Sequence, residues 1–422
     1  MLARLLAALL LLIAAPSAAE TVVVHAGRLI ADASRPASGP STITIVDGRI
    51  TAVAAGLTPA PAGARLIDLS SRTVLPGLVD LHVHLSGDPG TDYRQEAVDS
   101  DEYAALLGVR NAGRTLRAGF TTVRDLGSPP SVGFALARGT QEGLFPGPRI
   151  VASGPAVSIV GGHGDVSGFR PAVIEALSAH NSCTGAVECA RRVREAARAG
   201  AQVIKFTATG GVLSQQARGL EAHFTDEEMR AIVTTAHSLG LRVAAHAHGA
   251  RGIEAAARAG VDSIEHGTFA DAAAIAAMRR AGSFMVPTLM AFTGVRESLA
   301  QNRFTPIVAA KAREALSHLG EAARAARAAG VPVLFGTDAG VFDHGRNAQE
   351  FAILVGVVGM SPAEAIAAAT TGAARLLGME NEIGRIAPGF SADLIAVSGD
   401  PLSDVRVLEH VDFVMVRGRA AE

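Results

Sequence analysis

The stretch Arg198-Ala199-Gly200-Ala201-Gln202-Val203-Ile204 decides the fold, because its pattern recurs along the middle of the chain. An Ala- and Arg-rich helical segment ends at a glycine, and a short run of apolar residues follows it. The same order recurs at Gly119, Gly240, Gly260, Gly282 and Gly330. Glycine readily adopts the left-handed conformation that ends a helix, and an uninterrupted apolar run is typical of a buried parallel strand.

These units predict an α/β protein with a parallel sheet. The glycine-led units supply strands at 120–123, 202–204, 242–244, 261–264, 284–286 and 331–334, and the apolar runs 78–85 and 149–153 bring the number to eight. Eight strands alternating with helices over roughly 280 residues are typical of a (β/α)8 barrel of the TIM type. The alternative is a doubly wound open sheet, which would carry a glycine-rich phosphate loop after its first strand. No such loop is present in the sequence.

The flanks of the barrel region have a different texture. Short strand-like runs separated by turn residues lie at 21–25, 41–46, 49–54, 393–397 and 412–416. We expect the two distant segments to pair into one small β-sandwich domain. The predicted organisation is a small β domain from residues 20–74 and 385–422, and a barrel from residues 75–384.

The first residues have the features of a secretory signal. Arg4 precedes an apolar run at 5–15, and small residues follow up to Ala19. A positive start, an apolar stretch of about 7–15 residues and small residues before the cleavage site define a signal peptide. We therefore expect residues 1–19 to be removed, and the mature protein to be secreted or periplasmic without a membrane span.

The chain has two cysteines, Cys183 and Cys189. In an oxidising compartment we expect them to pair and close a short loop. The alternative is two free thiols near the start of a helix.

Composition argues against several classes of partner. The net charge is −2, aromatic residues make up 4% of the chain and Trp is absent. Nucleic acids and anionic membranes are bound by basic surfaces, and bases stack on aromatic side chains. We therefore expect a small-molecule or dipeptide-like substrate and no nucleic acid.

Polar or ionisable side chains stand just past the predicted strands. They are His82, His84, Asp125, Lys205, His246, His248, His266, Thr288 and Asp338. In a barrel the carboxyl ends of the strands meet at one face, where such folds keep their active sites. We therefore expect these side chains to converge on one site.

The His-x-His pair at His82 and His84 is the first candidate for metal binding. Residues two apart on a strand point to the same face, and paired imidazoles are good zinc ligands. The pair follows an apolar run at 73–80, which places it at the end of a buried strand. A His-x-His pair alone is weak evidence for a metal site. Its position at the end of a buried strand strengthens that interpretation.

Lys205 is the second unusual residue, because it lies inside an apolar strand. Burial lowers the pKa of a lysine and leaves a nucleophilic amine, which can take up carbon dioxide as a carbamate. Such an anion is suited to bridging two cations. The alternative is a salt bridge to a barrel carboxylate such as Asp125.

Three later strand ends supply the remaining candidates. His246 and His248 repeat the alternating pair, and we interpret His246 as a ligand and His248 as a contact for the substrate or its oxyanion. His266 ends the next strand. Asp338 can bind metal and act as general base and then acid.

Taken together, these residues resemble the amidohydrolase superfamily. The resemblance rests on the run Leu75-Pro76-Gly77-Leu78-Val79-Asp80-Leu81-His82-Val83-His84, on Lys205, His246, His266 and Gly336-Thr337-Asp338, and on the tail 384–394. It covers essentially the whole mature chain. Within the superfamily, the segments 161–165, 209–212 and 343–345 are similar to the metal-dependent Xaa-Pro dipeptidase-like carboxypeptidases, a branch that includes ochratoxin-hydrolysing amidases. One departure, Gly389-Phe390 where lysine is commoner, concerns a surface turn.

The resemblance implies an amide hydrolase with two Zn²⁺ or other divalent ions per subunit. His82, His84 and Asp338 would hold one ion and His246 and His266 the other, with N6-carboxylated Lys205 and a hydroxide between them. His163 and His344 are candidates for gripping a substrate carboxylate, with solvated loop histidines as the alternative. The resemblance also implies a homo-oligomer such as an octamer.

Two other functions stay open at this point. One is a deaminase or a cyclic-amide hydrolase of the imidazolone type on the same barrel, which usually needs one metal and no strand lysine. The other is a non-catalytic relative, which typically loses ligands, whereas this sequence keeps all of them.

Overall fold

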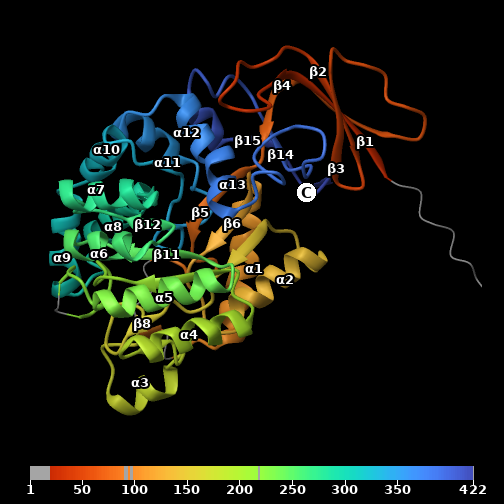
Figure 1. Cartoon of the computed structure of the whole chain (residues 1–422). Coiled ribbons are helices and arrows are strands. Elements are labelled where there is room, and N and C mark those ends of the chain that lie inside the picture. The colour runs from red at the N-terminus through yellow and green to blue at the C-terminus, as the bar shows by residue number, and fades with distance from the viewer. Residues whose placement is uncertain (1–19, 90–93, 96–97, 217–218, 422) are drawn as a thin grey trace, which may run out of the picture.

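A computed structural model describes residues 20–89, 94–95, 98–216 and 219–421 of the chain. A helix-covered barrel lies beside a smaller β domain (Figure 1). The predicted signal peptide at 1–19 lies outside the described residues. No helix within the described part of the chain is long and apolar enough to cross a membrane.

The barrel strands are parallel, as predicted from the glycine-led units. They are β5 (Leu78–Val83), β6 (Phe120–Asp125), β7 (Arg149–Ala152), β10 (Val203–Thr207), β11 (Arg242–Ala247), β12 (Ser263–His266) and β13 (Phe284–Val286). They form two sheets, β5-β6-β7 and β10-β11-β12-β13. The backbone N–H of Gln202 donates to the Ala152 carbonyl (2.9 Å) between the sheets. The TIM-like barrel is therefore confirmed.

The eighth strand, expected at 331–334, forms only isolated bridges. Val333 pairs with Met285 of β13, and Ala339 pairs with Val83 of β5, so this segment closes the barrel between the two sheets. Pro332 has no backbone N–H to donate to a ladder, which explains why no extended strand forms there.

Helices cover the outside of the barrel (Figure 1). They are α1 (Asp101–Arg117), α2 (Val132–Glu142), α3 (Pro171–Leu177), α4 (Ala186–Ala199), α5 (Asp226–Ser238), α6 (Ala250–Ala259), α7 (Ala272–Ala281), α8 (Leu289–Ala300), α9 (Pro306–Leu316), α10 (Glu321–Ala328), α11 (Gln349–Ile353), α12 (Pro362–Ala368) and α13 (Thr371–Leu377), with the short η2 (Leu354–Val358) and η3 (Val405–Glu409). Gly200, Gly260 and Gly282 end their helices in the left-handed conformation, with φ of 116°, 93° and 73°. These caps confirm the pattern that predicted the helix ends.

The two ends of the chain pair into one seven-stranded sheet, as expected for the small domain. Its strands are β1 (Thr21–Leu29), β2 (Ser41–Val46), β3 (Arg49–Ala55), β4 (Arg65–Pro76), β14 (Leu394–Val397), β15 (Val411–Val416) and β16 (Arg419–Ala420), in the order β16-β15-β14-β4-β1-β2-β3. β4 joins the two halves, because it pairs with β1 on one side and β14 on the other. The sequence did not indicate β4, since the first part of this strand is exposed and lacks a clean apolar alternation.

Cys183 and Cys189 form a disulfide, which settles the two alternatives left by the sequence. Both cysteines are fully buried. The bond ties the short strand β9 (Ser182–Cys183) to the first turn of α4, and β9 pairs with β8 (Ser158–Ile159) in the loop region after β7.

We expect the double variant Cys183→Ser/Cys189→Ser to lose about 2 kcal/mol of unfolding free energy, because a short closed loop restricts the unfolded chain only modestly. Urea denaturation with and without reductant measures this loss. Reductant should reproduce the loss in the wild type and leave the double variant unchanged. Equal urea midpoints for the two proteins without reductant would contradict the prediction.

Candidate metal centre

The predicted ligands meet in one cavity at the carboxyl ends of the barrel strands. Two groups of side chains have potential ligand atoms within 4.8 Å of one another: His82, His84 and Asp338, and His246, His248 and His266. Both groups and Lys205 line a cavity of about 420 Å³. The structure thus brings together all six residues proposed as ligands, with His248 beside them.

In the first group, the Nε2 atoms of both histidines point toward Asp338. The distance from Asp338 Oδ1 to His84 Nε2 is 3.3 Å, and to His82 Nε2 it is 3.6 Å. His82 Nδ1 donates to Glu265 Oε2, and His84 Nδ1 donates to the Gly127 carbonyl, both at 2.9 Å. Because each Nδ1 carries the proton, each Nε2 presents a lone pair to the cavity. This is the arrangement that a metal ion requires.

Asp338 stays ionised in this setting. Burial acts to raise its pKa, but the neighbouring His82 and His84 rings outweigh that effect and lower the pKa well below the usual value for aspartate. The partly buried carboxylate is therefore able to serve as a ligand or to accept a proton.

In the second group, hydrogen bonds also fix the rings. His266 Nδ1 lies 2.7 Å from Thr288 Oγ1, whose own proton goes to the Pro287 carbonyl. Thr288 therefore accepts from His266, which leaves the His266 Nε2 lone pair free. His246 Nε2 donates to the Gly210 carbonyl (3.3 Å), which leaves its Nδ1 lone pair free.

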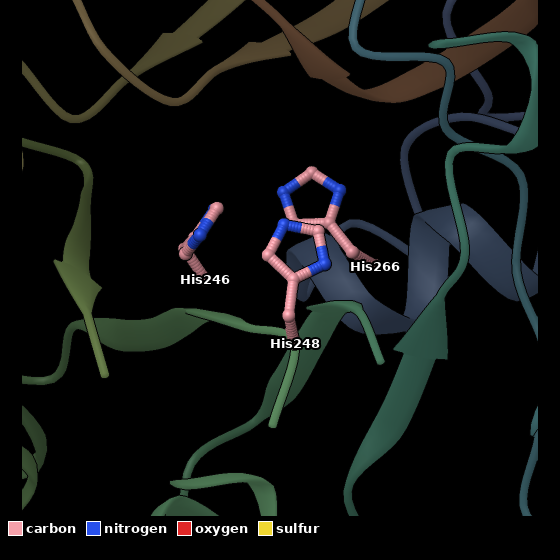
Figure 2. A group of neighbouring side chains, drawn as sticks. All are labelled: His246, His248 and His266. Atoms are coloured by element: carbon pink, nitrogen blue, oxygen red, sulfur yellow. The ribbon is translucent and has the colours of Figure 1, made fainter. Parts of the chain in front are cut away.

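His248 lies against His266 within the same group. Figure 2 shows the His248 and His266 rings one over the other, with the His246 ring beside them. The centroids of the stacked rings are 4.8 Å apart, and those of His246 and His266 are 4.6 Å apart. His248 Nδ1 is 2.8 Å from Thr268 Oγ1. Both His246 and His248 are thus close enough to His266 to share a metal ion with it.

Lys205 lies next to His82 of the first group and lines the same cavity as the second group. Its Nζ is 3.3 Å from His82 Nε2, and the residue is 4% exposed. Burial lowers the pKa of Lys205 to about 8. Among the described residues no carboxylate lies within ion-pair distance of Lys205, and Asp125 instead accepts from the backbone N–H of Leu85. The predicted alternative, a Lys205–Asp125 salt bridge, is not formed.

The backbone is strained at three of the strand ends. Asp338, His266 and Thr288 have φ of 62°, 66° and 51°, a region that residues other than glycine seldom adopt. Each such residue costs on the order of 1–3 kcal/mol, so it persists only where the surrounding structure holds it. Two of these residues, His266 and Asp338, line the cavity, and Thr288 accepts the hydrogen bond that orients His266.

A buried ion pair below the centre was not indicated by the sequence analysis. Arg124 Nη2 lies 2.8 Å from Glu265 Oε1, and both residues are almost fully buried. Burial acts to raise the pKa of Glu265, but the Arg124 guanidinium and the His82 ring outweigh it and lower the pKa to about 2. An ionised Glu265 fixes the tautomer of His82. The sequence does carry a signal for this pair, because Arg124 and Glu265 have opposite charges and each lies inside an apolar strand.

We expect Glu265→Gln to weaken metal binding by about 10–100-fold, because His82 loses the carboxylate that orients it. The variant should also lose about 3 kcal/mol of stability, because Arg124 is left buried without its partner. Metal titration and urea denaturation measure the two effects. In the double variant Glu265→Gln/Arg124→Met, stability should partly return while metal affinity stays low. An unchanged metal affinity in Glu265→Gln would contradict the prediction.

Asp80 supports the backbone at the first strand. It accepts hydrogen bonds from the His82 N–H (3.1 Å), the Thr337 N–H (3.0 Å) and Oγ1 (2.6 Å), and Asn347 Nδ2 (2.8 Å). Burial raises the pKa of Asp80 to about 6 in spite of these bonds. Asp80 thus connects the strand end that carries His82 to the segment before Asp338.

The two loop histidines differ in position. His163 lines the cavity, its ring centroid is 4.3 Å from that of His246, and its buried Nδ1 has no hydrogen-bond partner among the described residues. Burial lowers the pKa of His163 to about 3, so the ring is neutral. His344 does not line the cavity.

His344 instead lies behind His84. Its Nε2 is 3.2 Å from the His84 carbonyl, and its Nδ1 is 3.2 Å from Thr115 Oγ1. Both ring nitrogens of His344 are engaged in these contacts, so His344 holds the backbone of His84. The prediction that His344 contacts the substrate is therefore replaced by this supporting role.

A barrel with clustered imidazoles, a partly buried carboxylate and a buried lysine at its carboxyl face is typical of a metal-dependent hydrolase. The donor set fits divalent cations, because imidazole and carboxylate are the ligands that zinc takes. Residues 73–421 match the Amidohydrolase family, and the chain belongs to this family.

Individual relatives agree with this assignment. The ochratoxinase of Aspergillus niger is 31% identical over 94% of this chain and 85% of its own. A crystal structure of a Xaa-Pro dipeptidase with methionine bound in its active site superposes with a TM-score of 0.88 at 37% identity, covering 95% of this chain and 99% of that one. The crystal structure of the A. niger ochratoxinase gives a TM-score of 0.83 at 28% identity, covering 95% of each chain. The protein is a hydrolase that acts on amide bonds.

Proposed function

We propose that the protein uses two divalent metal ions to hydrolyse the amide bond of a dipeptide or an N-acyl amino acid. The observation that carries the proposal is the placement of buried Lys205 beside His82, where the two groups of ligand atoms meet. Lys205 Nζ lies 3.3 Å from His82, and His82 and His266 are adjacent, with ring centroids 5.1 Å apart. A single metal site would not require a buried lysine at this junction.

Each group supplies ligands for one ion. His82, His84 and Asp338 would hold the first, and His246 and His266 the second, with Lys205 as an N6-carboxylated bridge. When bound, a pair of such ions lowers the pKa of a water held between them toward neutrality and polarises a carbonyl group. His246 is preferred over His248 because the Gly210 carbonyl takes the Nε2 proton of His246 and leaves its Nδ1 lone pair free, whereas His248 is assigned the tautomer with a proton on Nε2.

Three residues of the chain would then act on the substrate. Asp338 accepts the proton of the attacking water and passes it to the leaving nitrogen. His248 would stabilise the oxyanion from Nε2, in the tautomer in which Thr268 Oγ1, 2.8 Å away, donates to Nδ1. His163 offers a neutral ring nitrogen to a polar group of the substrate, because its Nδ1 has no partner among the described residues.

The class of substrate is inferred from the relatives. One of them is a dipeptidase with an amino acid in its active site, and the other is an ochratoxinase. The cavity of about 420 Å³ falls within the range of small-molecule sites, roughly 300–1,000 Å³. Secretion and homo-oligomeric assembly stay proposals, which N-terminal sequencing of the exported protein and its mass in solution test.

The proposed function is tested with dipeptides and N-acyl amino acids incubated with zinc-loaded protein, alongside measurement of bound metal. We expect amide hydrolysis and a metal content near two ions per chain, both lost after chelation. Deaminase or cyclic-amide hydrolase activity with one ion per chain would overturn the proposal. Hydrolysis that survives complete removal of metal would overturn it as well.

A further inference from the structure

One side of the cavity is apolar and carries no charge. It consists of Val212 and Leu213 from the loop after β10, Ala291, Phe292 and Val295 of α8, and Ala315 of α9. We call this set the apolar wall. Among the described residues that line the cavity, Lys205 is the only lysine and arginine is absent. A charged substituent placed against this wall would therefore be buried without a partner.

A short segment, residues 211–216, forms part of the apolar wall and is held from behind. Lys311 of α9 donates from Nζ to the carbonyls of Gly211 and Ser214, both at 2.7 Å. Lys311 is 6% exposed and forms no ion pair among the described residues. A buried ammonium that is satisfied by carbonyls fixes those carbonyls in place, because losing them would leave the charge unpaired.

The same segment is also tied to the loop that carries His163. Gln216 Nε2 donates to the Gly162 carbonyl at 2.6 Å. A Cβ atom at Gly211 would lie 2.2 Å from Cε1 of His163, so only glycine allows this approach. The position of residues 211–216 therefore sets the apolar wall and the His163 ring together.

We propose that the apolar wall is the specificity subsite and takes a bulky, uncharged aliphatic or aromatic substituent of the amide substrate. Lys311 is the positioning residue that holds residues 211–216 in the shape this subsite needs. The inference rests on the proposed function, because it concerns the substrate of the same centre. It assigns selectivity to residues outside the metal ligands.

Two matched substrate series test the proposal. The first varies the leaving amino acid of N-acetyl amino acids among leucine, phenylalanine, glutamate and lysine, and the second varies the acyl group of acyl-glycines among hexanoyl, phenylacetyl and succinyl. In at least one series the apolar members should exceed the charged ones by about 100-fold or more in kcat/KM. Equal or better turnover of the charged members in both series would overturn the proposal.

Leu213→Arg places a cation in the wall on a half-buried loop residue. In the series that shows selectivity, this variant should reduce the preference for apolar over carboxylate-bearing members by about 10-fold or more, whereas Leu213→Met should keep it. An unchanged preference in Leu213→Arg would show that Leu213 does not contact the substituent and would overturn the subsite.

Lys311→Met separates positioning from chemistry. We expect KM for the apolar substrates to rise about 10-fold or more while kcat changes by less than about 3-fold, since the metal ligands are untouched. Equal KM values in Lys311→Met and the wild type would overturn the positioning role. If none of the compounds is hydrolysed, the proposed function fails, and calorimetry then measures the Kd of the same compounds. Tighter binding of the apolar members, lost in Leu213→Arg, would still support the subsite.

Discussion

Asp338→Asn is expected to lower kcat/KM by about 10³-fold or more, because the variant loses a carboxylate that is proposed both as proton acceptor and as anionic metal ligand. Asparagine keeps the shape of the side chain. It also tolerates the left-handed backbone that Asp338 adopts, with φ of 62°, so the loss should not arise from misfolding. Steady-state kinetics, metal content and the urea midpoint are measured together.

Asp343→Asn is the matched control for this substitution. Asp343 lies on the same loop but does not line the cavity. We expect its activity and metal content to match the wild type. An Asp338→Asn protein with more than about a tenth of wild-type kcat/KM would exclude Asp338 as the general base, since such groups contribute about 10²–10⁴-fold.

Lys205→Ala is expected to reduce the bound metal below two ions per chain and kcat/KM by about 10³-fold, because the proposed bridging anion between the two ligand groups is lost. The truncation leaves space beside His82 for a small carboxylic acid. Formate or acetate should therefore restore part of the metal content and the activity. Metal analysis and kinetics across a series of acid concentrations measure the recovery.

Lys205→Met separates the bridging role from the loss of volume. Methionine fills the space of the lysine stem without supplying an amine, so added acid should not rescue this variant. Rescue of both variants would mean that acid acts elsewhere. Full activity of Lys205→Ala without added acid would show that no bridge forms at this position.

The barrel and most of the centre could be predicted because both depend on local signals. A glycine after a helical segment and an apolar run after the glycine mark each strand, and the strand ends then carry His82, Lys205 and Asp338 to one face. The segment at 331–334 was the exception, because Pro332 removes a donor from the ladder.

The supporting contacts could not be predicted, since they join residues that are distant in sequence. Glu265 meets His82 across the barrel, and Lys311 of α9 donates to the carbonyls of Gly211 and Ser214 in a loop. Neither contact is marked by a periodic pattern of residues in the sequence. The role of His344 depended on the direction of its ring, which is set by Thr115 and the His84 carbonyl rather than by its place on a strand-end loop.

The seven-stranded sheet has a consequence for how the chain folds. Val74 of β4 pairs with Ala396 of β14, so one of the sheet's central contacts has to close a loop that includes the entire barrel. Loop closure over long sequence distances is slow, and a ribosome delivers the N-terminal segment first. Until β14 arrives, β4 has an open edge that can pair with another chain. The small domain is thus the last part to be completed during synthesis, and β4 keeps an unpaired edge until then.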